Sequence, residues 1–192
     1  MSRSLVFAAA LLASLVATAA HALALSELAA TLATVPESRA RFTDVRTVAA
    51  LGSPLERYGT LWYARPGKLE MVVAGPVPER LSVVDGTMTI ESRGTTRVVD
   101  LRSQPPLLAW IEGIRATLAG DEAALRRHFE PTVSGTLERW TLVLVPRDAR
   151  LRAVVARVSI AGERERVRTI EVDEVSGDRS VMTIAPAAPV TK

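Results

Sequence analysis

Short runs of alternating apolar and polar residues make up most of this chain. From residue 38 onward, β-branched and apolar residues occur in runs separated by Gly, Pro and Asp, a pattern typical of antiparallel strands. In one run Trp140, Leu142 and Leu144 alternate with polar residues. In another, the apolar side is expected to hold Val154, Ala156, Val158 and Ile160. The pattern predicts ten strands, over 38–50, 55–64, 68–74, 79–84, 87–92, 95–101, 138–145, 153–161, 164–174 and 179–185.

Three segments have helical spacing instead. Leu25, Leu28, Leu32 and Val35 recur every three or four residues before Pro36, which predicts a short N-terminal helix. A second helix follows the Pro105-Pro106 pair, and Gly120 stops it. Its apolar face holds Leu107, Trp110, Ile111, Ile114 and Leu118. Asp121 is placed to cap a third helix that runs to about Phe129, with Pro131 as its terminator.

One-sided strands of this kind form a sheet with one apolar and one wet face. The Asp85-Gly86 pair predicts a tight hairpin, because both residues tolerate a positive φ. A sheet of this size must close or have its apolar face covered, and three short helices cannot fill it densely. We therefore expect a mainly β fold with some α, an incomplete antiparallel barrel of about 10–11 strands. An N-terminal helix and an inserted helical lid would leave an apolar, partly open cleft.

The first 22 residues have the pattern of a cleavable signal peptide. Arg3 supplies the positive charge, 5–17 form an apolar segment too short to cross a bilayer, and Ala20-His21-Ala22 fits the cleavage rule. Cleavage after Ala24 fits the same rule. No Cys follows for lipidation, so we expect a periplasmic protein that does not span the membrane. The remainder is interpreted as a single domain, 23–185, with a flexible tail, 186–192.

Composition excludes several classes of function. The chain has no Cys, which removes disulfides, thiol chemistry and Cys-ligated metals. Its formal charge is +3, and the arginines are scattered among nearly as many carboxylates. Nucleic-acid binding would require a basic face with interleaved aromatics. We expect no nucleic-acid partner, and we expect a monomer.

Candidate chemistry is sparse. His128 is the one histidine left after signal cleavage, and no Gly-x-Ser-x-Gly elbow or Gly-rich phosphate loop is present. Glu163 and Glu165 alternate with Arg164 and Arg166, which indicates a solvated row of opposite charges. No pattern places other carboxylates together; the candidates were Glu56, Glu70, Glu79, Asp85, Glu91 and Asp100. We predict no catalytic residues, no metal site and no cofactor.

One motif resembles a known family. The segment Gly59-Thr60-Leu61-Trp62-Tyr63-Ala64-Arg65-Pro66 is similar to the Gly-x-Leu-Trp-x-x-Arg-Pro motif of the LolA family of periplasmic lipoprotein carriers. Further segments resemble the family in order and spacing: Arg41-Phe42-Thr43, Val83-Val84-Asp85-Gly86 and Val181-Met182-Thr183-Ile184-Ala185-Pro186. The strand after the hairpin has Met88, Thr89 and Ile90 where the classical carriers are aromatic. The chain thus resembles a divergent LolA-related branch, whose members accompany envelope lipid systems such as aryl polyenes.

The resemblance implies a carrier that holds acyl chains between the sheet and the lid. Its cargo would be a lipid or lipoprotein, received from an inner-membrane donor and passed to an outer-membrane acceptor. By match with the motif, Arg65 would hold the lid shut and take part in lipid transfer. A planar guanidinium that stays charged suits hydrogen bonding to lid carbonyls. Residues proposed to line the cavity are Trp62, Met71, Leu81, Val83, Trp110, Ile111 and Ile114.

Two other hypotheses stay open at this point. One is a lipid- or lipoprotein-sensing or structural envelope module that uses the same scaffold without transport. The other is an enzyme, which would require a cluster of polar side chains in the cleft. Apolar residues that line a cavity also look the same in sequence as core residues.

Overall fold

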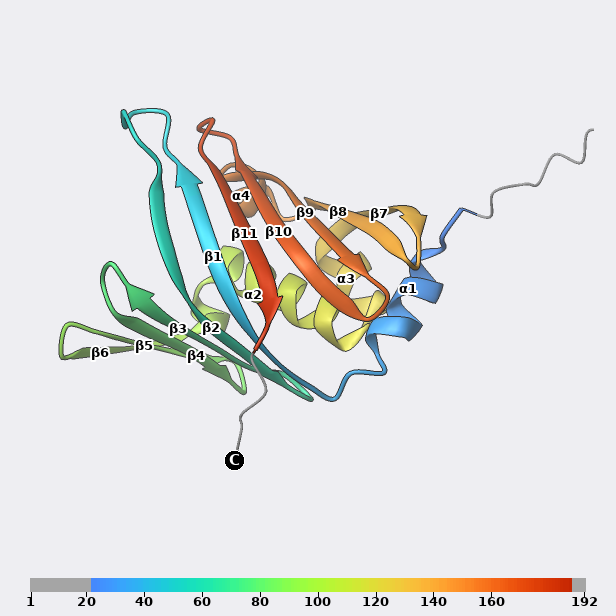
Figure 1. The fold of residues 1–192 in the computed structure, drawn as a ribbon, viewed down its shortest axis with the longest axis horizontal. Coiled ribbons are helices and arrows are strands. Elements are labelled where there is room, and N and C mark those ends of the chain that lie inside the picture. The colour runs from blue at the N-terminus through green and yellow to red at the C-terminus, as the bar shows by residue number, and fades with distance from the viewer. Residues whose placement is uncertain (1–21, 188–192) are drawn as a thin grey trace, which may run out of the picture.

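The computed structural model describes residues 22–187. Its strands form a single antiparallel sheet in the order β6-β5-β4-β3-β2-β1-β11-β10-β9-β8-β7, so the sheet is not closed (Figure 1). The strands are β1 (Glu37–Thr47), β2 (Leu55–Ala64), β3 (Lys68–Gly75), β4 (Glu79–Val84), β5 (Thr87–Ser92), β6 (Thr95–Asp100), β7 (Phe129–Thr136), β8 (Arg139–Pro146), β9 (Val155–Glu163), β10 (Arg166–Glu174) and β11 (Arg179–Pro186). The expected incomplete antiparallel barrel is confirmed.

Strand order explains where the helices lie. β6 and β7 follow each other in sequence but form opposite edges of the sheet. The segment between them must cross from one edge to the other. It contains a 3-10 turn, η1 (Leu101–Ser103), and the helices α2 (Pro105–Ala119) and α3 (Glu122–His128). These are the expected inserted helices. Two shorter helices are α1 (Leu25–Leu32), which was expected, and α4 (Ala149–Arg152), which was not.

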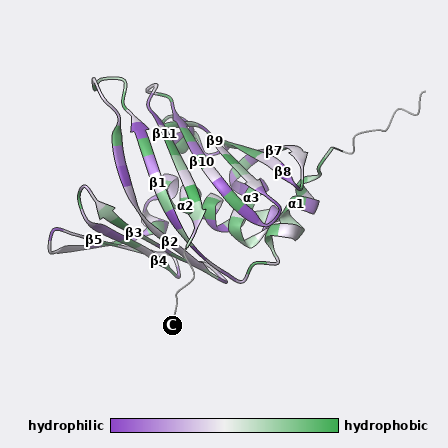
Figure 2. Cartoon of the chain, viewed as in Figure 1, coloured by the Kyte–Doolittle hydropathy of each residue, from purple (hydrophilic) through white to green (hydrophobic). Residues whose placement is uncertain are grey.

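The register defines an inner face of the sheet, which is the face turned toward the helices. Leu142 lies opposite Ile160, Ile160 opposite Ile170 and Ile170 opposite Met182, so these four side chains share one face. The same row continues from Met182 to Asp44 of β1. Alternation of apolar and polar residues is visible along the strands (Figure 2).

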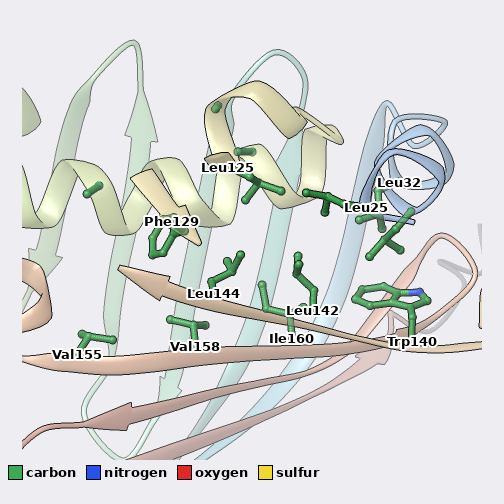
Figure 3. Close-up of a cluster of buried hydrophobic side chains, with 14 of the residues drawn as sticks. Leu25, Leu32, Leu125, Phe129, Trp140, Leu142, Leu144, Val155, Val158 and Ile160 are labelled. Atoms are coloured by element: carbon green, nitrogen blue, oxygen red, sulfur yellow. The ribbon is translucent and has the colours of Figure 1, made fainter. Parts of the chain in front are cut away.

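The larger hydrophobic cluster fills the β7–β10 end. Side chains of β8 and β9 point toward α1 and α3, with Trp140, Leu142, Leu144 and Phe129 almost fully buried (Figure 3). The Trp140 indole N–H donates to the Arg164 carbonyl at 2.8 Å. A Cβ at Gly162 would lie 2.3 Å from the Trp140 ring, so a glycine is required beside that ring.

The opposite end of the sheet holds a smaller cluster. Three buried residues form it, namely Val83, Met88 and Leu101. Half-buried residues of β3–β6 and the first half of α2 pack around them. The two clusters lie at the two ends of the sheet, and α2 contributes to both.

Two further details differ from the predictions. β7 was not expected, since Pro131 was interpreted as a terminator of the helix before it. Because β7 is an edge strand, a residue without an N–H is tolerated there. The alternation predicted for 153–161 is wrong at its start. The β9–β10 register shifts here, because Arg157 lies opposite Asp173 and Val155 lies opposite Glu174, which leaves Ala156 without a partner on β10. As a result Val155 is buried and Val154 is exposed.

The predicted signal peptide lies outside the described residues apart from Ala22, and so do the last five residues of the predicted tail. Within residues 22–187, no helix combines the length and apolar character that crossing a bilayer requires.

Candidate functional site

α2 presents an unusual distribution of side chains. Its buried positions hold small residues, namely Ala109, Gly113, Ala116 and Thr117. Its large apolar residues stay half-buried, namely Leu107, Leu108, Trp110, Ile111, Ile114 and Leu118. A helix that only closed a core would bury its largest apolar groups first. Part of the surface of these large apolar residues of α2 therefore stays accessible.

Small residues are needed on the buried side of α2 because neighbours approach closely. A Cβ at Gly113 would lie 2.6 Å from the Phe129 ring, and the Thr117 hydroxyl donates to the Gly113 carbonyl within the helix. The side of α2 toward α3 and β7 is thus tightly packed.

The middle of the sheet shows the same half-buried apolar character. Leu61 of β2 lies opposite Met71 of β3, and Phe42 of β1 lies opposite Ile184 of β11, on the inner face. Phe42 is buried, while the other members are half-buried. We call the set Phe42, Leu61, Met71, Met182 and Ile184 the inner apolar face. None of these five belongs to either hydrophobic cluster.

Arg65 fastens α2 to the sheet. It follows the last residue of β2, and its Nη2 donates to the carbonyl oxygen of Ala119 at 2.8 Å. Ala119 is the last residue of α2, where carbonyls have no partner within the helix and the helix dipole is negative. A guanidinium can donate a hydrogen bond to such a carbonyl, and its positive charge interacts favourably with the negative end of the helix dipole. The predicted contact between Arg65 and a lid carbonyl is present.

A second contact lies one turn back along α2. Arg115 packs over Gly67, where a Cβ would lie 2.9 Å from its Cδ. Its guanidinium pairs with Glu112 at 2.8 Å and with Asp121 at 3.3 Å. Burial opposes the charge on Arg115, but the two carboxylates raise its pKa above the usual value. A cavity of about 210 Å³ adjoins it between α2 and the turns at 66–68 and 85–86.

The end of α2 also rests on α1. Gly120 has φ +66°, and a Cβ there would lie 2.0 Å from the Ala29 carbonyl oxygen. Asp121 then caps α3 by accepting from the Ala124 N–H. That hydrogen bond is the main cause that holds the pKa of Asp121 below its usual value. The junction between α2 and α3 is therefore held in place by α1, by Arg65 and by the Asp121 cap of α3.

Most of the predicted cavity residues lie on facing surfaces. Met71, Leu81 and Val83 are on the inner side of the sheet, with Leu81 and Val83 in the smaller cluster. Ile111 packs against that cluster and Trp110 against the larger one, whereas Ile114 belongs to neither.

Trp62 is the exception. It alternates with Leu61 and Tyr63 along β2 and so lies on the outer face of the sheet. Its indole N–H donates to Glu37 at 2.8 Å, and Arg39 stacks over its ring at 5.4 Å. The hydrogen bond from Trp62, together with that from Arg39, lowers the pKa of Glu37. The expectation that Trp62 lines the cavity does not agree with this position.

Two polar features of the inner side were not predicted. Asp44 is buried there and contacts Arg57 and Ser180. The Tyr63 hydroxyl is buried without a hydrogen-bond partner among the described residues. Asp44 lies two residues beyond Phe42 in a strand pattern, so its face was readable from the sequence. Its partners were not readable, because they come from other strands.

Three of the remaining candidates lie at a helix end and around a hairpin turn. His128 is the half-buried last residue of α3. Glu163 at the end of β9 pairs with Arg168 of β10, and Glu165 in the turn between these strands pairs with Arg166. Within residues 22–187, no three His, Cys, Asp or Glu side chains gather closely enough to hold a metal ion.

The molecule is thus an unclosed antiparallel half-barrel with a helix, apolar on its half-buried side, that crosses its open face. A family model described as "Outer membrane lipoprotein carrier protein LolA-like" matches residues 17–191, and the chain belongs to this family. Curated protein sequences give no significant match.

Solved structures of similar fold are distant in sequence. A LolA superfamily protein from Nitrosomonas europaea is 9% identical with a TM-score of 0.44, over 87% of this chain and 93% of that chain. A domain titled a putative outer membrane lipoprotein-sorting protein, from Vibrio parahaemolyticus, is 8% identical with a TM-score of 0.45, over 88% and 93%. A chain of the MucA/MucB complex of Pseudomonas aeruginosa is 13% identical with a TM-score of 0.43, over 86% and 59%.

Proposed function

We propose that this protein is a periplasmic carrier that binds the acyl chain of a lipid or lipoprotein between α2 and the inner apolar face. Cargo would be received from an inner-membrane donor and passed toward an outer-membrane acceptor, with no covalent step. Membership of the LolA-like family supports this function. The observation that carries it is that the large apolar residues of α2 and four of the five residues of the inner apolar face are only half-buried.

Acyl chains suit this arrangement for a simple reason. Each buried CH₂ group contributes about 0.8 kcal/mol, and the half-buried residues of both surfaces gain burial at the same time. The Tyr63 hydroxyl adds a buried donor that a carbonyl of the cargo could satisfy.

The fastening at Arg65 would control access. A hydrogen bond to a charged group contributes about 1.5–3 kcal/mol, so loss of this contact would shift the balance between the closed and open states by at most a few kcal/mol. Differential binding of cargo or a partner can shift such an equilibrium. Arg65 would hold the lid in the empty protein and release it during loading and transfer.

Native mass spectrometry of the protein purified from its own periplasm tests the binding function. We expect a stoichiometric acyl-bearing adduct, which organic extraction would identify. A mass without any adduct, combined with no uptake of offered lipids, would contradict the carrier function. It would favour a non-transporting module on the same scaffold.

The role of Arg65 is tested by Arg65→Ala beside Arg41→Ala, which removes an exposed arginine from the outer face of β1. We expect both variants to fold and only Arg65→Ala to change cargo retention or release. Unchanged loading and transfer by a folded Arg65→Ala variant would exclude the fastening role.

A further inference from the structure

A buried carboxylate, paired with a partly exposed arginine, lies on the inner side of the sheet. Asp44 of β1 pairs with Arg57 of β2, and its side chain is 2% exposed. All other ion-paired carboxylates in residues 22–187 keep at least 16% exposure. Asp44 lies beside Met182 and two residues from Phe42, both members of the inner apolar face. A carboxylate in this position requires an explanation.

A gain in folding stability does not explain why a carboxylate is buried at Asp44. Removing a carboxylate from water costs several kcal/mol, and a well-packed apolar replacement of a buried ion pair is often neutral or stabilising. Both oxygens of Asp44 are occupied, since Oδ2 accepts from Arg57 Nε at 2.6 Å and Oδ1 accepts from the Ser180 hydroxyl. Asp44 already has a cationic partner, which is Arg57. The geometry of Asp44 fixes the position of Arg57.

Arg57 keeps most of its donors. Its side chain is 44% exposed, and only its Nε takes part in a hydrogen bond to a described residue. Nη1 and Nη2 together present a planar pair of nitrogens, which matches the two oxygens of a carboxylate or phosphate. The adjacent Arg46 differs, because its Nη2 contacts Glu174 at 2.7 Å and Asp178 at 3.5 Å. Arg57 is the better cation for a ligand.

Its position relates these donors to the apolar surface. Arg57, Gly59 and Leu61 occupy every second position of β2, so all three lie on the inner side of the sheet. Two residues of a strand span about 6.6 Å. Arg57 is near the start of β2, next to the connection from β1, and Leu61 lies four residues farther along the strand. A molecule with an anionic head and an apolar tail could contact both.

We propose that Arg57 binds the anionic headgroup, a carboxylate or phosphate, of an amphiphile whose acyl chain lies on the inner apolar face. Asp44 and Ser180 are positioning residues that hold the guanidinium toward the ligand. The proposal rests on the proposed function, and it narrows the cargo to anionic lipids.

The test compares a fluorescently labelled dodecanoic acid with its methyl ester, which has the same chain and no charge. The full mature protein is expected to bind the acid at least about tenfold more tightly than the ester. Arg57→Gln is expected to lower affinity for the acid to that for the ester. Arg41→Gln, on the outer face, is expected to keep the full preference.

Arg57→Gln leaves Asp44 buried without its partner, so the double variant Asp44→Asn/Arg57→Gln is measured as well. It removes both charges and should fold, and it should also show no preference for the acid. Persistence of the preference in this variant would overturn the proposal. Equal binding of acid and ester by the unchanged protein would overturn it too, while leaving acyl binding intact.

Inorganic phosphate distinguishes a headgroup site from a site for free anions. Unlabelled dodecanoate should displace the labelled acid, and equimolar phosphate should not. Equal displacement by phosphate would overturn the assignment to a lipid headgroup. Binding of neither the acid nor the ester would overturn the proposed function itself, which is a different result from the loss of discrimination.

Discussion

The two ends of the sheet differ in how they are built. At the β7–β10 end, sixteen buried residues form one cluster with α1 and α3, whereas three form the cluster at the β3–β6 end. The first end behaves as a conventional core. At the second end, mostly half-buried residues hold β3–β6 against the first half of α2. The difference indicates that the β7–β10 end supplies more of the stability, and that fewer buried contacts hold the β3–β6 end against α2.

The largest effect is expected from truncating the large core. Leu142→Ala removes a fully buried side chain, and we expect a loss of about 4 kcal/mol in the free energy of unfolding. Met88→Ala in the small cluster should cost about 2 kcal/mol, because half-buried neighbours can relax around it. Denaturant titrations of both variants measure this. Equal losses would remove the distinction between the two ends.

The junction of α2 with α1 provides the next effect. Gly120→Ala should cost about 3 kcal/mol, because a strained positive φ is combined with a contact of 2.0 Å to the Ala29 carbonyl. Gly86→Ala is the control, since Gly86 has φ +77° with open space around it and should cost about 1 kcal/mol. Similar thermal stabilities of the two variants would show that close packing at Gly120 contributes nothing.

Hydrogen exchange tests the comparison without a mutation. We expect amides of β5 and β6 to exchange about a hundredfold faster than those of β8 and β9, because fewer buried contacts hold them. Such a ratio corresponds to about 2.7 kcal/mol of local stability. Uniform protection across the sheet, measured by mass spectrometry, would mean that both ends open together.

The smallest effect concerns the cap between α2 and α3. The pKa of Asp121 is lowered in the folded state. Its contribution to the free energy of unfolding is therefore present above about pH 4 and is lost as the pH falls through the folded-state pKa. Asp121→Ala should cost about 1 kcal/mol at pH 7 and less at pH 3. Unfolding measured at both values checks the sign. A penalty that does not shrink in acid would mean that the charge is irrelevant.

Alternation and turn residues were sufficient to predict most of the fold. Trp140, Leu142 and Leu144 face inward as their spacing predicted, and Asp85-Gly86 forms its hairpin turn. β7 was missed because Pro131 was interpreted as the terminator of α3, although Phe129, Pro131 and Val133 alternate with polar residues along the strand. Pairing with β8 stabilises it, and pairing between strands is not visible in a local pattern.

The site was predictable to a smaller extent. The motif indicated Arg65, and its contact with the lid is present. The motif also indicated Trp62, but not the face of the sheet that it occupies. The contact of Asp44 with Ser180 joins residues 136 positions apart, through a strand order that no local pattern contains.

The fastening of the lid has an evolutionary consequence. Arg65 holds a main-chain oxygen, so the side chain at position 119 takes no part in the contact. Any residue that maintains the helix would leave the acceptor in place. The lid surface is free to diverge and adapt to new molecules, while selection for the fastening would fall on a single arginine codon.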